Sequence, residues 1–209
     1  MEHLIVDRSH LVRADPNTVR VVESRGGFVV GDMIAKGWVG YLRGWKLEEQ
    51  ELEGEKWRHQ KYAVEAARSV PGGRGILKIP TGGGKTRIAR GIAEACGGLW
   101  VYVVYGRDLV EQAKKTLAGS AIVCGWGAFE RVEEADGVII DECHGLGALG
   151  RWRTALRVRS PRWIGLSATP LDRGEGNERV IDILGGIIYE ISVEELTARG
   201  VLSKVKTRS

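Results

Sequence analysis

The most constraining feature of this sequence is a glycine-rich loop between an apolar run and an amphipathic run. The loop reads Pro-Thr-Gly-Gly-Gly-Lys-Thr over residues 80–86, after the mostly apolar run 76–79 and before a helical pattern over 85–96. Consecutive glycines let backbone N–H groups converge on phosphate oxygens, and the dipole of the following helix favours the same anion. A plain glycine turn would need neither the Lys-Thr pair nor the flanking strand and helix. The pattern therefore predicts a Walker A loop made by Thr81, Gly82, Gly83, Gly84, Lys85 and Thr86.

This loop predicts ATP and Mg²⁺ as the cofactors. Lys85 is expected on the β- and γ-phosphates, and the Thr86 hydroxyl is expected to be a ligand of Mg²⁺. A nearby strand should then end in a carboxylate that holds the hydrated metal. The apolar run 137–140 ends in Asp141, and Glu142 follows it. We expect Asp141 to bind Mg²⁺ and Glu142 to polarise the attacking water, with Lys85 as the third catalytic residue.

The chain around the loop alternates apolar runs with helical patterns. Strands are expected at 76–79, 100–104, 121–123, 138–140, 163–166 and 187–191. Helices are expected near 57–69, 85–96, 107–118, 151–157, 176–184 and 193–199. Because the strands are apolar throughout rather than alternating, both faces of their sheet must be covered. The sequence therefore predicts an α/β fold, a doubly wound and mostly parallel sheet.

Several motifs resemble those of the first motor domain of superfamily-two DExH helicases and translocases. Residues 141–144 read Asp-Glu-Cys-His, similar to the second motif, and residues 165–170 read Gly-Leu-Ser-Ala-Thr-Pro, similar to the third. The resemblance covers roughly residues 57–205 and implies a RecA-like domain. It also implies that Ser167 and Thr169 couple the nucleotide site to a nucleic-acid track through His144.

The resemblance extends to the segments before and after the Walker loop. Arg58, His59 and Gln60 look like the glutamine motif, which implies that Gln60 reads the adenine edge and that Arg58 lies at the cofactor. Residues 106–112 look like motif Ia, which implies a nucleic-acid contact at Arg107.

Two hydroxyl positions of the family pattern are missing from the expected nucleic-acid track. Tyr105 and Gly106 stand where motif Ia usually has Pro-Thr. The segment 123–129 stands where the family commonly offers a threonine to the nucleic-acid backbone. We expect the backbone N–H groups at Gly106 and Gly125 to take over these phosphate contacts.

The resemblance also implies a second RecA-like domain that supplies an arginine finger, either in the full-length protein or in another subunit. Because the 39 residues after Pro170 hold no second set of strands, this chain alone is expected to show little or no ATP turnover. The function expected is that of an ATP-dependent DNA helicase or translocase. Two alternatives stay open: a nucleotide-switched nucleic-acid-binding module without turnover, and a fragment of an RNA helicase.

The first 45 residues are expected to form a separate accessory unit. A strand at 4–6, a helix begun by Asp15 and Pro16, and apolar runs at 28–30 and 38–42 precede a charged linker over 46–56. The motor domain is expected over 57–209. In position the unit resembles the accessory domains of phage-type DNA branch-migration helicases, which implies duplex, forked or single-stranded DNA as the partner. Trp38 and Trp45 are candidates for an aromatic platform for bases; the alternative is packing against the motor domain.

Charge and cysteine usage narrow the class of protein further. The formal net charge of +4 comes entirely from the last eleven residues, because residues 1–198 carry 27 basic and 27 acidic side chains. Residues 143–171 contain no acid, so their arginines, Arg151 and Arg153 first among them, are expected to contact phosphates; a solvated basic helix is the alternative. Three cysteines without CxxC spacing favour a reducing, cytoplasmic location. No apolar run approaches 18 residues, so no membrane partner is expected.

Overall fold

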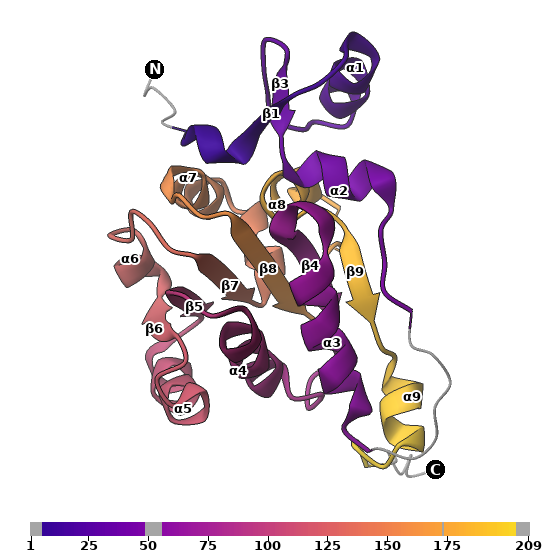
Figure 1. Cartoon of the computed structure of the whole chain (residues 1–209), viewed down its shortest axis with the longest axis vertical. Coiled ribbons are helices and arrows are strands. Elements are labelled where there is room, and N and C mark those ends of the chain that lie inside the picture. The colour runs from indigo at the N-terminus through magenta and orange to yellow at the C-terminus, as the bar shows by residue number, and fades with distance from the viewer. Residues whose placement is uncertain (1–5, 49–55, 173, 204–209) are drawn as a thin grey trace.

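The computed structural model describes residues 6–48, 56–172 and 174–203. Its centre is a six-stranded sheet in the order β6-β5-β7-β8-β4-β9, in which every neighbouring pair is parallel (Figure 1). The strands are β4 (Arg74–Lys78), β5 (Trp100–Val104), β6 (Ile122–Gly125), β7 (Gly137–Asp141), β8 (Arg162–Ser167) and β9 (Ile187–Glu190). The predicted parallel α/β sheet is confirmed.

Helices cover both faces of this sheet. One face packs against α3 (Arg58–Ser69), α4 (Lys85–Cys96), α5 (Arg107–Leu117) and α9 (Val193–Ala198). The other face packs against α6 (Trp126–Phe129), the 3-10 helix η3 (Cys143–Gly147), α7 (Leu149–Arg157) and α8 (Asn177–Leu184). Neighbouring strand residues point to opposite faces, and both sets are apolar: Leu77 lies in the first core and Ile76 in the second. This is why the strand sequences show no polar alternation.

The strand order places three loops side by side. β8 lies between β7 and β4, and all three strands run in the same direction. Their carboxyl ends therefore meet at one edge, where the glycine loop follows β4, Asp141 ends β7 and Ser167 ends β8. In an open α/β sheet this edge is the usual place for a ligand.

The N-terminal residues form a small antiparallel sheet of three strands in the order β1-β3-β2. Its elements are η1 (Arg8–His10), β1 (Leu11–Arg13), α1 (Pro16–Ser24), β2 (Val29–Val30), β3 (Met33–Ala35) and α2 (Gly37–Arg43). Helix α1 begins as predicted, with the Asp15 side chain accepting from the backbone N–H of Asn17 and Thr18. Of the strand expected at 4–6, residues 4 and 5 lie outside the described part. Val6 lies in no strand, because the chain there packs against the end of α7, where Asp7 donates its N–H to the Leu156 carbonyl.

The N-terminal sheet is attached to the motor sheet through a buried carboxylate on α8. Asp182 accepts hydrogen bonds from the indole N–H of Trp38 at 2.7 Å, the backbone N–H of Phe28 at 2.9 Å and the indole N–H of Trp152 at 3.0 Å. Burial raises the pKa of Asp182 to about 6, against the opposing effect of these donors. Gly37 lies so close to α8 that a Cβ on it would stand 1.7 Å from the Ile181 carbonyl oxygen. The attachment is therefore both polar and sterically close.

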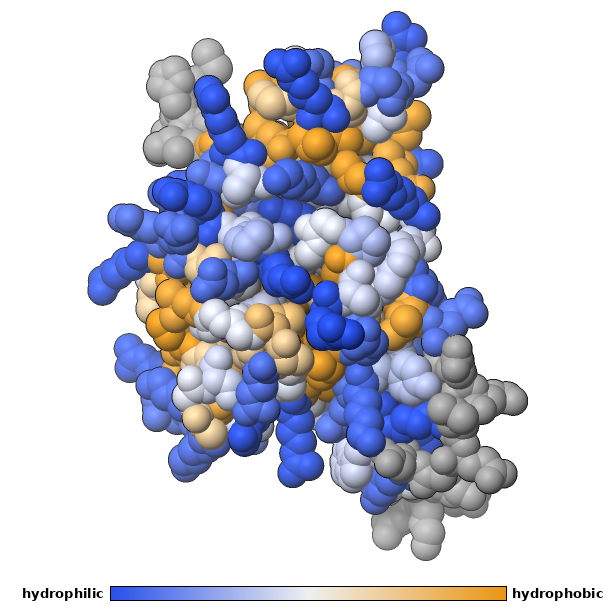
Figure 2. Space-filling model, viewed as in Figure 1, coloured by the Kyte–Doolittle hydropathy of each residue, from blue (hydrophilic) through white to orange (hydrophobic). Residues whose placement is uncertain are grey.

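These contacts correct the prediction for Trp38. Its side chain is 1% exposed, and its only polar atom bonds to Asp182, so it cannot stack on a nucleobase. The alternative, packing between the N-terminal unit and the motor domain, is right. Trp45 is half-buried and packs beside the first core. Apolar surface remains visible over the N-terminal unit (Figure 2), where Val30 is 46% exposed.

The described residues contain no helix with the length and hydropathy needed to cross a membrane.

Candidate nucleotide-binding site

The glycine loop has the backbone that its sequence predicts. Gly82 and Gly84 adopt φ angles of +83° and +84°, in the left-handed region that favours glycine. A Cβ on Gly84 would also stand 2.2 Å from Gln60 Nε2, and one on Gly83 would stand 2.6 Å from Ile79 Cγ2. Gly84 precedes the first residue of α4, so the loop leads into the N-terminus of a twelve-residue helix. Thr81 is exposed at the start of this cradle.

Helix α3 holds the loop from the side. His59 donates from Nε2 to the Gly83 carbonyl oxygen at 2.8 Å, and Gln60 Nε2 lies 3.5 Å from the same oxygen. Gln60 thus lies beside the loop, and its contact with the adenine edge stays a prediction. Arg58 instead stacks on Tyr62, with its guanidinium carbon 5.3 Å from the ring centroid. His59 was not singled out from the sequence, although it is the residue that fixes the loop most closely.

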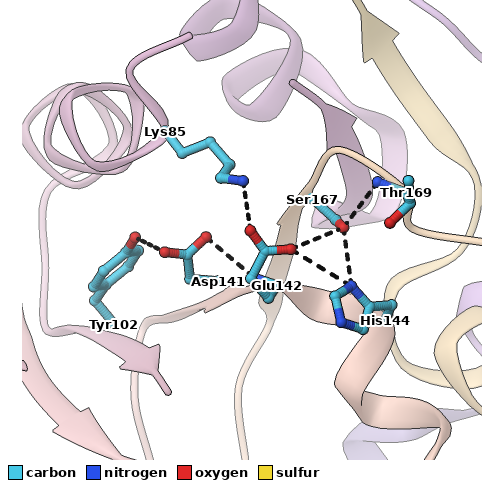
Figure 3. A network of polar contacts seen from close by, with 7 residues as sticks. All are labelled: Lys85, Tyr102, Asp141, Glu142, His144, Ser167 and Thr169. Carbon is cyan, nitrogen blue, oxygen red and sulfur yellow. Dashed lines mark hydrogen bonds and ion pairs between the residues drawn. The ribbon is translucent and has the colours of Figure 1, made fainter. Parts of the chain in front are cut away.

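Lys85 and Glu142 form an ion pair at the carboxyl edge of the sheet. Lys85 Nζ lies 2.6 Å from Glu142 Oε1, although 57 residues separate them in sequence (Figure 3). Glu142 has a φ of +47°, an unusual backbone conformation for a residue with a side chain. The turn aims the carboxylate back toward the glycine loop, so the two predicted catalytic residues meet.

Asp141 is held by a tyrosine from the neighbouring strand. The Tyr102 hydroxyl donates to Asp141 Oδ2 at 2.8 Å, and the Glu142 N–H donates to Oδ1 at 3.0 Å. Thr86, the other predicted metal ligand, lies near enough to this hydroxyl to act on the pKa of Tyr102, which it lowers. Burial raises the pKa of Asp141, and the Tyr102 hydrogen bond and the charge of Lys85 oppose that shift. Tyr102 therefore positions Asp141, one of the two predicted metal ligands.

Tyr102 was missed by the sequence argument, although a signal was present. It stands in a strand whose other residues are apolar, and its side chain is fully buried. A buried tyrosine hydroxyl needs a hydrogen-bond partner. Burial and the adjacent Asp141 raise the pKa of Tyr102 far above its ordinary value, so the hydroxyl stays protonated and acts as a donor.

A second branch of the network leads from Glu142 to the loop after β8. Ser167 Oγ donates to Glu142 Oε2 at 3.3 Å and lies 3.2 Å from His144 Nδ1. His144 Nδ1 is 3.5 Å from the same carboxylate oxygen. Thr169 contributes its backbone N–H, which donates to Ser167 Oγ at 3.1 Å. Of the three residues expected to couple nucleotide and nucleic acid, Ser167 and His144 therefore lie at Glu142, and Thr169 holds Ser167 (Figure 3).

Four residues expected on the nucleic-acid track lie at the same edge, on the side of β5 and β6: Gly106, Arg107, Gly125 and Arg151. Gly106 precedes α5 with a φ of +89°, and the Arg107 side chain beyond it is exposed. Gly125 ends β6, where a Cβ would meet no atom closer than 3.9 Å. Arg151 lies in the first turns of α7, and Arg153 is half-buried on the same helix.

The arginine-rich segment is not one continuous surface. Arg159 pairs with Asp7 at 3.8 Å and with Glu134 at 3.3 Å. Arg162 begins β8, so it lies at the amino edge of the sheet, opposite Asp141. The acid-free stretch of sequence thus reaches both edges, and acids from other segments neutralise part of it.

These residues fit a nucleotide with Mg²⁺. The loop leads into the N-terminus of α4, a Cβ at position 84 would collide with Gln60, and Lys85 stands at the end of the loop. The hydroxyl of Thr86 and the carboxylate of Asp141, which is held by Tyr102, are hard oxygen donors of the kind that Mg²⁺ prefers.

Comparison with known proteins supports the same class. No family model matches the chain. Over 162 residues it is 32% identical to the DNA 3′-5′ translocase XPB2 of Sulfurisphaera tokodaii, a match that covers 66% of this chain and 37% of the translocase. The chain thus spans well under half the length of this relative.

Two helicases are among the solved structures that share the fold. The Hef helicase domain of Pyrococcus furiosus superposes with a TM-score of 0.53 and 20% identity, covering 66% of this chain and 39% of that one. The UvsW helicase from bacteriophage T4 gives 0.53 and 18%, covering 69% and 63%. The parallel sheet of this chain therefore has the RecA-like fold that these two structures share. Sequence and fold together confirm the resemblance to the N-terminal part of superfamily-two helicases and translocases.

Proposed function

We propose that this chain is the ATP-binding first motor domain of an ATP-dependent DNA helicase or translocase. The observation that carries the proposal is the meeting of Lys85, Asp141 and Glu142 at the carboxyl edge, directly beyond a glycine loop. The sequence similarity of this chain to a protein named as a DNA translocase supports DNA as the partner.

The geometry supports a division of work among the residues. The N–H groups of the glycine loop and the start of α4 would bind the phosphates, and Lys85 would exchange its bond to Glu142 for the β- and γ-phosphate oxygens. Thr86 and Asp141 would hold Mg²⁺, which neutralises charge on these phosphates when bound. Glu142, released from Lys85, would accept a proton from the water that attacks the γ-phosphate.

The contacts of Glu142 also support coupling to nucleic acid. One carboxylate oxygen bonds Lys85 and the other faces Ser167 and His144. A change at the γ-phosphate that moves Lys85 would therefore shift Glu142 and, through Ser167, the loop after β8. We propose that this loop and η3 transmit the nucleotide state to the DNA-binding edge.

Turnover should depend on a second RecA-like domain, in the full-length protein or in another subunit. An arginine that stabilises charge on the transferred phosphoryl group is worth roughly 10³ to 10⁵ in rate. We propose that the second domain supplies it and that this chain alone hydrolyses ATP slowly. A nucleotide switch without turnover is the second candidate, favoured by the ion pair that holds Glu142 away from catalysis.

Single-turnover ATP hydrolysis with enzyme in excess separates the two candidates. In a motor domain, Glu142→Gln should lower the slow rate at least about tenfold, because it removes the general base while keeping the size of the side chain. Glu133→Gln, which changes an exposed carboxylate elsewhere, is the matched control. Equal rates for the wild-type chain and Glu142→Gln would reject the catalytic assignment and favour the switch.

A further inference from the structure

Two places where the sequence departs from the helicase pattern meet in the structure. Tyr105 follows β5 and Trp126 follows β6, and the residues just before them, Val104 and Gly125, are partners in the sheet. The guanidinium carbon of Arg151 lies 4.4 Å from the Tyr105 ring centroid and 5.5 Å from that of Trp126. The three side chains thus form one cluster, in which a cation is shared by two aromatic rings.

Contacts with the surrounding structure hold this cluster in place. The Trp126 ring packs edge-on against Phe129, with 5.5 Å between centroids and 89° between planes, and Phe129 is fully buried. Arg151 donates from Nη1 to the Gly145 carbonyl oxygen at 3.2 Å. Gly145 leaves room for this approach, because a Cβ on it would stand 2.9 Å from the same nitrogen. The rings are therefore fixed before any ligand arrives.

The cluster faces solvent at the edge of the sheet that carries the nucleotide site. Tyr105 is 45% exposed, so one of its ring faces is open to a ligand in solvent. Trp126 and Arg151 are half-buried, and the exposed Arg107 follows one residue after Gly106. An aromatic surface with a positive border is suited to a ligand that has both flat rings and negative charge.

We propose that Tyr105, Trp126 and Arg151 form a base-stacking site for single-stranded nucleic acid. Stacking uses the π-face that every base has, so the site would accept any sequence. This proposal rests on the proposed function and adds to it a contact with bases. The sequence predicts only contacts with the nucleic-acid backbone in these two segments. The aromatic platform for bases expected at Trp38 thus lies on the motor domain instead.

The site is connected to Glu142 through two hydrogen bonds of η3. Arg151 Nη1 donates to the Gly145 carbonyl oxygen, and the Gly145 N–H donates to the Glu142 carbonyl oxygen at 2.9 Å. A nucleic-acid strand stacked against Arg151 would therefore influence the position of the turn that directs the Glu142 carboxylate.

Binding of oligodeoxythymidylate and of an abasic strand of equal length distinguishes stacking from phosphate contacts. Both strands carry the same phosphates, but only the first carries bases. The wild-type chain should bind oligodeoxythymidylate more tightly, and Trp126→Ala should weaken that affinity about 5- to 150-fold, the range for one aromatic stack. The same change should leave the abasic strand and the dependence of affinity on salt unaltered, because it removes no charge.

Three further variants complete the test. Tyr105→Phe should bind like the wild-type chain and Tyr105→Ala should lose affinity, which separates ring from hydroxyl. Trp57→Ala removes a tryptophan that is 40% exposed and also has cations over its ring, and it should leave affinity for the strand unchanged. Circular dichroism verifies that each variant is folded.

Equal affinity of the wild-type chain for the two strands, no binding of either strand, or no effect of Trp126→Ala in a folded chain would overturn the stacking site. Nucleotide binding, measured separately by calorimetry, would be untouched by any of these results. A chain that fails to bind nucleotide would instead overturn the proposed function.

Discussion

The hydroxyl of Tyr102, in the middle of β5, lies 2.8 Å from the carboxylate of Asp141, which ends the adjacent strand β7. This buried hydroxyl therefore holds the carboxylate that is expected to bind Mg²⁺. Tyr102 is a positioning residue in this arrangement, since it touches a predicted metal ligand rather than the reacting atoms.

Tyr102→Phe should weaken the effect of Mg²⁺ on nucleotide binding. Loss of one hydrogen bond to Asp141 is worth roughly 1 to 1.4 kcal/mol, so affinity for ADP with Mg²⁺ should fall about 5- to 10-fold. Affinity for ADP in EDTA should stay the same. Tyr189→Phe removes a hydroxyl from another buried tyrosine of the same core and serves as the control in calorimetry. An equal loss with and without Mg²⁺ would show that Tyr102 supports the loop rather than the metal ligands.

The buried carboxylate of Asp182 should make stability depend on pH. Its folded pKa of about 6 lies above the ordinary 3.8, so its protonated form is favoured by folding. The contribution is complete below about pH 4 and is lost as pH rises through 6, and a shift of two units corresponds to about 3 kcal/mol. Asp182→Asn, which cannot ionise, should remove this part of the pH dependence. Urea unfolding of the wild-type chain and Asp182→Asn between pH 4 and 7.5 measures this part. Parallel curves of the free energy of unfolding against pH would contradict the burial of a titrating group.

The two edges of the sheet should differ in their effect on DNA binding. Log affinity falls with log salt, and Arg107→Ala, at the carboxyl edge, should make this fall less steep by about 0.9 for duplex DNA, because one phosphate contact is lost. Arg159→Ala should leave the slope unchanged, because Arg159 pairs with Asp7 and Glu134. Salt titrations of the wild-type chain, Arg107→Ala and Arg159→Ala test this. A less steep salt dependence for Arg159→Ala would place DNA at the amino edge.

Local pattern was sufficient to predict the sheet and the core of the site. A parallel strand buried on both faces has a recognisable composition, and the parallel order brings every strand's carboxyl end to one edge. Lys85, Asp141 and Glu142 could therefore be placed together before their contacts were known.

The rest depends on contacts between distant segments. Trp38 meets Asp182 across 144 positions of sequence, and nothing near Trp38 indicates that it is buried. Tyr102, His59 and the pair Tyr105 and Trp126 gain their roles only from the neighbours that the strand order gives them. Side chains whose partners come from another strand or helix are the ones that sequence pattern alone does not assign.

Calorimetric titration of the wild-type chain and Lys85→Ala with ADP and Mg²⁺ tests the central claim most directly. The wild-type chain should bind one nucleotide, and Lys85→Ala should bind it roughly 30- to 150-fold more weakly, equivalent to about 2 to 3 kcal/mol for a charged hydrogen bond. Lys115→Ala, an exposed lysine on α5, is the control and should bind like the wild-type chain. Equal affinities of the wild-type chain and a folded Lys85→Ala variant would contradict the assignment of residues 80–86 as the phosphate-binding loop.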